Sequence, residues 1–229
     1  MQALQMDSAS QSQDGRVRIL IIDDHSLMRR GLRELIDREG DLEVCGEAES
    51  ARTALDLLEQ IEPDIVIMDL TLTDLHGLDL IGQVKSRYPD IRIVVLSMHD
   101  EKLYAERCLR AGASGYVQKR DAPEKVIRAI RSVLSGQVYV SDDLAHQILR
   151  RIVDQQQSPE SSPFARLSDR ELQLLELIGQ GMTTREIADH LHLSVKTVHT
   201  YRENLKAKLD LENVYQLVRF AVAWTLKQE

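Results

Sequence analysis

The stretch RILIIDDHSLMRRGL, residues 18–32, runs from an apolar segment directly into two adjacent aspartates, Asp23 and Asp24. The apolar, β-branched run predicts a buried strand, and the residues after the aspartates have the spacing of an amphipathic helix. Two like charges at the end of a buried strand repel each other, and burying them unpaired is costly. The pair therefore predicts that a cation lies between them.

The same alternation of strand and helix patterns continues to about residue 134, which predicts an α/β domain with a parallel sheet and helices on both faces. The apolar runs at 64–68 and 91–96 fit strands that are buried on both sides. The strands are predicted at 17–22, 42–48, 64–70, 91–97 and 114–117, and the helices at about 26–38, 51–60, 77–87, 101–111 and 122–134.

The pattern changes after this domain. Residues 141–153 predict a short amphipathic helix with Ser141 as its N-cap, and DQQQSPESSP, residues 154–163, has the polar, proline-containing composition of a linker. Four further helices are predicted at about 168–179, 183–190, 194–208 and 212–226. We therefore expect a disordered leader at 1–16, an α/β domain at 17–134, a linker with a short helix at 135–163, and a small all-α domain at 164–229.

Composition limits the possible environments. No apolar run approaches the ~20 residues of a membrane span, and the N-terminus lacks the basic and apolar regions of a secretory signal. The only cysteines, Cys45 and Cys108, favour a reducing cytoplasm over a disulfide framework. The net charge of −8 belongs to residues 1–165, whereas residues 194–208 carry four basic residues and one acid. A local basic face is sufficient for binding nucleic acid phosphates.

Chemistry-bearing residues end several predicted strands. Asp23 and Asp24 end the first, Asp69 the third and Ser97 the fourth, and Lys119 follows the fifth. The carboxyl ends of parallel strands share one edge, so these groups converge there if those four strands are neighbours. Carboxylates with a Mg²⁺ ion, a hydroxyl and an ammonium group suit phosphoryl transfer to an aspartate.

Each residue also has a simpler interpretation. Asp24 suits the N-cap of the helix that starts near Ser26, Ser97 suits a cap as well, and a lysine after a strand is usually solvated. Their joint occurrence on the appropriate strands favours a site.

Four segments, LIIDDHSLMRRGL, DIVIMDLTLTDLHGLDL, IVVLSMHD and GASGYVQK, resemble the receiver domain of two-component response regulators of the NarL/FixJ subfamily over residues 17–134. The resemblance implies a flavodoxin-like fold with strand order 2-1-3-4-5. It implies phosphorylation of the chain by a sensor histidine kinase. The implied roles are phosphoacceptor for Asp69, Mg²⁺ ligands for Asp23, Asp24, Asp69 and the Thr71 backbone carbonyl, switch pair for Ser97 and Tyr116, and phosphate binding for Lys119. The chain departs from the family at Thr73 and Arg120, where proline is frequent, and at Met98, where a small residue is common.

Residues 183–202, TTREIADHLHLSVKTVHTYR, predict two helices joined by a tight turn, with Thr183 and Ser194 at the helix starts. Val195, Val198, Leu205 and Leu209 are predicted to form the buried stripe of the second helix. This pattern alone also fits a generic helical bundle. However, LSDRELQLLELIGQG and the IADHL-to-VKTV core resemble the LuxR-type helix-turn-helix over about residues 164–227. The resemblance places His199, Thr200 and Glu203 toward bases, and Lys196, Thr197, Arg202 and Lys206 toward phosphates of double-stranded promoter DNA.

Together these features predict a phosphorylation-activated, DNA-binding transcription regulator rather than an enzyme. Before phosphorylation we expect its DNA-reading helix to be shielded or misoriented, and afterwards a homodimer that reads a pseudo-palindrome. An aspartyl-phosphate hydrolase typically has a second aspartate two residues after its nucleophile, where this chain has Thr71, which argues against that class. A dinucleotide-binding domain needs a glycine-rich turn after the first strand, and the segment DDHSLM has no glycine. The remaining alternative is a receiver-like regulator controlled by a ligand or partner without phosphorylation.

Overall fold

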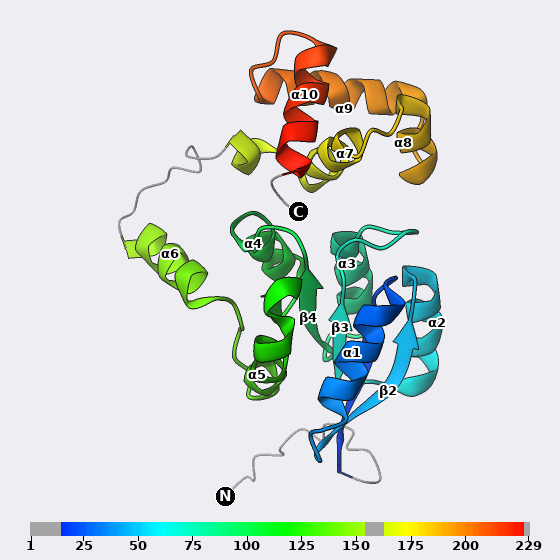
Figure 1. Cartoon of the computed structure of the whole chain (residues 1–229), viewed down its shortest axis with the longest axis vertical. Coiled ribbons are helices and arrows are strands. Elements are labelled where there is room, and N and C mark those ends of the chain that lie inside the picture. Colours follow the sequence, from blue (N-terminus) through cyan, green and yellow to red (C-terminus); the bar gives the residue numbers. More distant parts are fainter. Residues whose placement is uncertain (1–14, 154–162, 227–229) are drawn as a thin grey trace, which may run out of the picture.

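The computed structural model describes residues 15–153 and 163–226, which form an α/β domain and a helical domain packed against it (Figure 1). The predicted leader falls almost wholly outside the described residues. In the part of the chain that is described, no helix combines the length and apolar character needed to cross a bilayer.

The five strands form one parallel sheet in the order β2-β1-β3-β4-β5, which confirms the predicted α/β, flavodoxin-like topology. The order matters because it places β1, β3, β4 and β5 side by side, so their carboxyl ends share an edge. The strands are β1 (Val17–Ile22), β2 (Leu42–Ala48), β3 (Ile65–Met68), β4 (Arg92–Ser97) and β5 (Gly115–Gln118).

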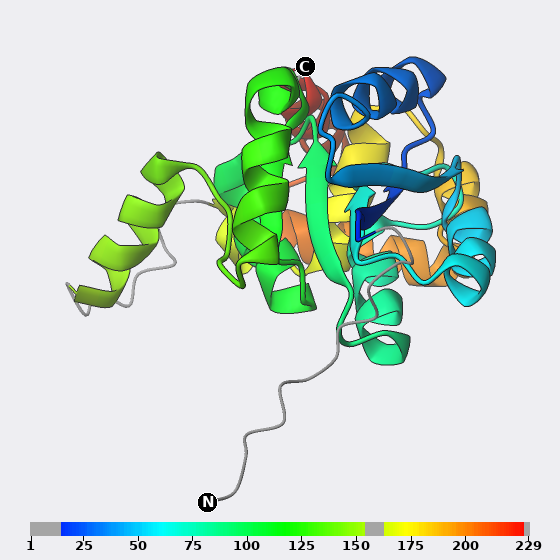
Figure 2. The same ribbon diagram turned by 90° about the horizontal axis from the view of Figure 1, so that it is seen from below.

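Helices cover both faces of the sheet (Figure 2). Alternate strand residues face opposite sides, so Ile19 and Ile21 pack with α1 and α5 while Leu20 and Ile22 pack with α2, α3 and α4. Both layers are fully buried, which explains why the central strands are almost continuously apolar. The helices are α1 (Ser26–Ile36), α2 (Ala51–Ile61), α3 (Gly77–Arg87), α4 (Glu101–Ala111) and α5 (Ala122–Leu134), with a 3₁₀ turn at Lys119–Asp121.

Local signals explain most helix ends. Ser50 caps α2 in a capping box with Thr53, and Gly112 ends α4 with a φ of 111°, a conformation that favours glycine. The simpler interpretation of Asp24 as the cap of α1 is wrong. The N-cap is His25, whose side chain makes no capping bond among the described residues, so Asp24 is available for another role.

The segment after α5 still pairs with the sheet before α6 begins. Tyr139 lies past the end of α5, yet its carbonyl accepts from Tyr116 N at 2.8 Å and its N–H donates to Ser114 O at 3.1 Å, so it pairs along the β5 edge. Helix α6 (Asp142–Val153) follows, and Ser141 Oγ accepts from Leu144 N at 3.2 Å, as expected for its N-cap.

The helical domain consists of a 3₁₀ turn (Pro163–Arg166) and the helices α7 (Asp169–Gly179), α8 (Thr184–His190), α9 (Val195–Lys208) and α10 (Val214–Thr225). Thr183 and Ser194 cap α8 and α9, as predicted. Val198 and Leu205 are fully buried, but the prediction for Val195 is wrong because it is 43% exposed. Val195 is the first residue of α9 and precedes the turn that packs inward.

Candidate functional site

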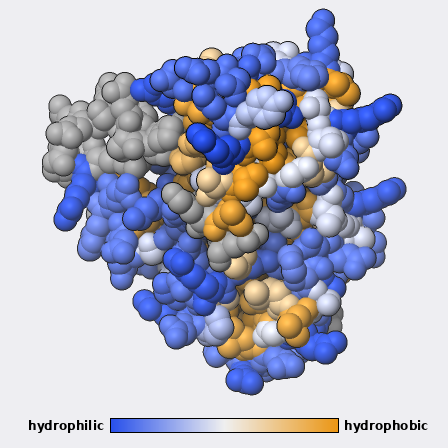
Figure 3. Space-filling view, turned by 45° about the horizontal axis from the view of Figure 1, so that its top comes forward, coloured by the Kyte–Doolittle hydropathy of each residue, from blue (hydrophilic) through white to orange (hydrophobic). Residues whose placement is uncertain are grey.

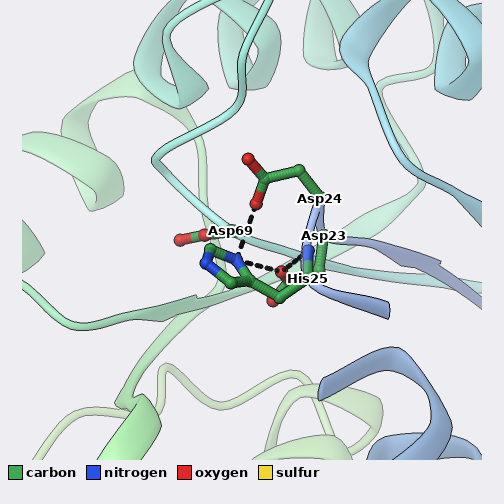
Figure 4. Close-up of side chains that lie close together, drawn as sticks. All are labelled: Asp23, Asp24, His25 and Asp69. Carbon is green, nitrogen blue, oxygen red and sulfur yellow. Dashed lines mark hydrogen bonds and ion pairs between the residues drawn. The ribbon is translucent and has the colours of Figure 1, made fainter. Parts of the chain in front are cut away.

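The carboxyl edge of the sheet brings the predicted acidic residues together. Asp23, Asp24, His25 and Asp69 each offer a ligand atom within 4.8 Å of the others (Figure 4). The first three follow β1 and Asp69 follows β3, and these strands pair in register up to Ile22 and Met68. The convergence predicted from the strand ends is therefore observed.

Lys119 joins this cluster from the end of β5. Its Nζ lies 2.7 Å from Asp23 Oδ2 and 2.7 Å from Asp69 Oδ2, and all three side chains are at most 5% exposed. Burial raises the pKa of Asp69 to about 6, although the Lys119 ammonium acts in the opposite direction. Burial alone would lower the pKa of Lys119, but the two carboxylates raise it overall. The single positive charge of Lys119 thus faces the negative charges of Asp23 and Asp69, and Asp24 lies beside them.

The carboxylate oxygens fit a hard cation. Within the described residues, neither Asp23 Oδ2 nor Asp24 Oδ1 has a hydrogen-bond partner of ordinary geometry, although both are buried. Lys119 Nζ lies 2.7 Å from Asp23 Oδ2, and His25 Nδ1 lies 2.7 Å from Asp24 Oδ1. Carboxylate oxygens are ligands that Mg²⁺ prefers. The acidic cluster is therefore typical of a Mg²⁺ site.

His25 was not predicted from the sequence. Its Nδ1 lies 3.1 Å from Asp23 Oδ1, and its side chain is 66% exposed. A histidine after two aspartates gives no periodic signal, but its position next to the pair is visible in the sequence.

The predicted switch pair lies inside the fold. Ser97 ends β4 and is fully buried, and its Oγ accepts from His99 N at 3.2 Å. Tyr116 on β5 is also buried, and its hydroxyl donates to His99 O at 2.9 Å. Both residues therefore hydrogen-bond to the backbone of His99, a residue that was not predicted to belong to the site. Met98, between Ser97 and His99 in the sequence, has a side chain that is 55% exposed.

Helix α9, which the sequence predicts to read DNA, is open to solvent. Lys196, His199, Thr200 and Glu203 are exposed, and α9 packs mainly against α7, α8 and α10. The expectation that the receiver shields this helix is thus not met in this structure, and the alternative expectation, a misoriented helix, stays a prediction.

Three of the predicted phosphate-contacting residues are partly buried. Arg202 Nη1 donates to Thr184 Oγ1 at 3.0 Å, which links α9 to α8. Lys206 Nζ lies 2.8 Å from Glu203 Oε2, so an acid on the same face offsets its charge. Thr197 contacts Ser194 Oγ at the start of the helix. Lys196 is the exposed cation of this set.

Helix α7 of the helical domain lies over the acidic edge of the sheet, where Glu176 meets two receiver side chains. The Tyr104 hydroxyl donates to Glu176 Oε1, and His99 Nδ1 lies 3.5 Å from the same oxygen. The His99 ring stacks on Tyr104, and its Nε2 lies 3.0 Å from Thr71 Oγ1. His99 therefore contacts both Thr71, in the loop after β3, and the helical domain.

Arg107 of α4 makes a second interdomain contact. Its guanidinium pairs with Asp169 at the start of α7 and donates to Phe164 O at 3.1 Å and to Leu167 O at 2.8 Å. The buried apolar residues of the two domains form one continuous cluster through this interface.

Burial gives this interface a predicted pH dependence. It raises the pKa of Glu176 from 4.5 to about 8, so the docked form holds the proton more tightly than a separated form does. The contribution to docking is complete below pH 4.5 and is lost as pH rises through about 8. We expect the radius of gyration in small-angle scattering to increase between pH 7 and pH 9.

The matched variant is Glu176→Gln, which keeps a neutral side chain at every pH and is expected to remain compact at pH 9. Burial lowers the pKa of His76 and His99 to about 4, so both stay neutral in this range. Asp24 and His190 line a cavity that Glu176 also lines. An equal expansion of the Gln variant would show that another group is responsible.

Comparison with known families agrees with this geometry. Residues 19–131 match the response regulator receiver domain, and residues 165–221 match the bacterial regulatory proteins of the luxR family. The matched segments fall within the α/β and helical domains described above.

Similar full-length proteins support both assignments. The chain is 34% identical to the response regulator UvrY of Escherichia coli K12 over 90% of this chain and 94% of the relative. It is 37% identical to the response regulator GacA of Pseudomonas aeruginosa, over 90% and 95%. RcsB of Salmonella enterica serovar Typhimurium, solved bound to the rprA promoter with the phosphomimetic BeF₃⁻, has a TM-score of 0.69 at 25% identity, covering 90% of this chain and 98% of RcsB. The chain therefore belongs to the NarL/FixJ family of two-component response regulators, non-enzymatic phosphoacceptors that act as DNA-binding transcription regulators through a LuxR-type helix-turn-helix domain.

Proposed function

We propose that Asp69 is the phosphoacceptor of this regulator and receives its phosphoryl group from a sensor histidine kinase. The observation that carries the proposal is the buried contact of Lys119 with both Asp69 and Asp23 beside Asp24. An Asp69 carboxylate oxygen bonds to phosphorus as the bond from phosphorus to the donor histidine nitrogen breaks. The nitrogen keeps the electron pair and later takes up a proton, and the product is an acyl phosphate.

The neighbouring residues have distinct roles in this proposal. Asp23, Asp24, Asp69 and the Thr71 backbone carbonyl would hold Mg²⁺, which when bound offsets the negative charge on the phosphoryl oxygens. Lys119 is within reach to neutralise a phosphoryl oxygen. The Ser97 hydroxyl, at the end of β4, would donate to another, and Tyr116, which is buried beside it, would be its partner in the switch.

We assign DNA binding to the exposed face of α9. His199, Thr200 and Glu203 would face base edges in the major groove, and Lys196, Thr197, Arg202 and Lys206 would face phosphates. The exposure of α9 and the presence of promoter DNA in the RcsB structure support this assignment. The contact of Arg202 with Thr184 makes it the weakest candidate of the set.

Replacing Lys196 by Ala tests the DNA-binding face. Removal of one phosphate contact is expected to weaken binding equally across promoter sequences and to reduce the slope of log K against log salt by about one unit. Fluorescence anisotropy at several salt concentrations measures both quantities. The matched control is Lys102→Ala on α4, an exposed lysine of the receiver, which should leave the slope unchanged. An unchanged slope for Lys196→Ala would remove this residue from the interface.

Phosphorylation would act by favouring a two-fold dimer. Apolar patches interrupt an otherwise hydrophilic surface (Figure 3), and the exposed apolar residues of α10 include Val214, Val218 and Val222. We expect Mg²⁺ with beryllofluoride to shift the full chain from monomer to dimer in size-exclusion chromatography with light scattering, and to tighten promoter binding. If neither property changes, the proposed coupling is wrong.

The proposed domain boundaries are 17–134 for the receiver, 135–163 for the linker and 164–229 for the DNA-binding domain. Tyr139, which pairs with Gly115 at the edge of β5, lies within the proposed linker. We propose that the protein works in the cytoplasm, where the kinase and promoter DNA are both accessible.

A further inference from the structure

The exposed face of α9 carries an acid on the side that we assign to DNA. The side chain of Glu203 is 67% exposed, and it lies one helical turn after His199 and Thr200, which are also exposed. Duplex DNA has about one negative charge per 1.7 Å of its axis, so a carboxylate that enters a groove alone weakens binding. Glu203 therefore needs a cation beside it and a hydrogen-bond donor on a base.

Lys206 supplies the cation from the next turn of the same helix. Its Nζ lies 2.8 Å from Glu203 Oε2, and its side chain is 16% exposed, so the methylene stem is packed and the ammonium is held beside the carboxylate. A carboxylate has about four lone-pair positions and an ammonium has three donors. The pair thus keeps lone pairs of Glu203 for a base and donors of Lys206 for a phosphate.

The neighbouring Thr200 does not supply a competing donor. Its hydroxyl donates to Lys196 O at 3.1 Å, which occupies the one hydrogen of that group. The hydrogen-bond preference of this part of the face is therefore that of the Glu203 carboxylate, which accepts and cannot donate.

We propose that Glu203, held by Lys206, reads a cytosine in the major groove by accepting from its N4 amino group. The inference rests on the proposed binding of DNA by α9. Guanine presents two acceptors in the major groove, thymine presents an acceptor and a methyl group, and adenine presents an acceptor next to its amino group. Cytosine alone presents a donor without an acceptor of its own, so it is the base that an acid tolerates best.

Selection of binding sites from a randomised duplex library by the full-length chain, followed by sequencing, tests the assignment. We expect one cytosine per half-site, preferred about tenfold over the other bases, and loss of that preference at this position alone in Glu203→Ala. Glu203→Gln is expected to shift the preference to adenine, because an amide donates to N7 while it accepts from N6. The matched control is Glu106→Gln, which removes a helical pair with Arg110 from the receiver and should leave the motif unchanged.

A cytosine that depends on Glu203 and becomes an adenine in Glu203→Gln supports the inference. The inference is refuted, while DNA binding by α9 stands, if both Glu203 variants select the wild-type motif, if the position that responds to them prefers another base, or if the wild type binds duplex DNA without sequence preference. A wild-type chain that binds no duplex DNA would overturn the proposed function, and the inference with it.

A double-mutant cycle tests Lys206 as the positioning residue. Lys206→Met keeps the apolar stem but leaves the acid without its cation, so we expect about tenfold weaker binding to the selected site and a reduced cytosine preference. In the Glu203→Gln background, where the side chain is neutral, the same change should weaken binding to the site selected by that variant by about threefold or less. Lys206→Arg should restore the cytosine preference. Equal losses in both backgrounds would show that Lys206 acts on phosphate alone and does not hold Glu203.

Discussion

Asp69→Asn is expected to reduce phosphorylation by small phosphodonors from stoichiometric to undetectable. An amide offers no carboxylate oxygen to attack phosphorus, whereas its size and shape match those of the acid. Asp69 has the buried position, the Lys119 contact and the neighbouring aspartates that an acceptor requires. Promoter binding by the variant should then no longer respond to Mg²⁺ and acetyl phosphate.

The variant is also expected to fold normally. Burial already raises the pKa of Asp69 to about 6, so replacing its charge with a neutral amide removes repulsion from Asp23, and Lys119 keeps Asp23 as its partner. The matched control is Asp56→Asn, an exposed aspartate on α2, which should be phosphorylated like the wild type. Retained phosphorylation in Asp69→Asn would place the acceptor at another residue.

Lys119→Ala is expected to give the largest loss of stability among the site variants. Removal of the ammonium leaves Asp23 and Asp69 buried without their cation, and breaking a buried ion pair costs about 3 kcal/mol or more. The free energy of unfolding in urea, measured with EDTA, should fall by about this amount. Addition of Mg²⁺ should restore part of it, because a bound cation replaces the missing positive charge.

Lys125→Ala provides the comparison for that experiment. Its ammonium pairs with Asp121 at 2.8 Å on the surface of α5, and surface pairs of this spacing contribute about 0.5 kcal/mol or less. If Lys119→Ala were as stable as Lys125→Ala in EDTA, or if Mg²⁺ had no additional effect on it, the carboxylates would not form a shared cation site.

The sequence predicts the receiver fold closely because its signals are local. Buried parallel strands are continuously apolar, and Ser50 and Gly112 mark helix ends through their own backbone and side-chain chemistry. The predicted third strand, 64–70, is longer than the observed Ile65–Met68. The loop after β3 begins at Asp69, and an apolar pattern does not show where the backbone turns.

The contacts between the domains could not be predicted in this way. Tyr104 and Glu176 are 72 positions apart, and neither lies in a motif that indicates a partner. Glu176 lies on α7 between Gln173 and Gln180, and from the sequence such an acid would ordinarily be assigned to solvent. Only the packing of α7 against α4 shows that it is buried, and the same packing gives His99 its contacts on both sides.

The most direct test of the account is the intact mass of the full-length protein after incubation with Mg²⁺ and acetyl phosphate. We predict a gain of one phosphoryl group that requires Mg²⁺, is lost in EDTA and is absent from Asp69→Asn. A wild-type chain that never gains this mass, or an Asp69→Asn chain that gains it equally, would contradict the central claim.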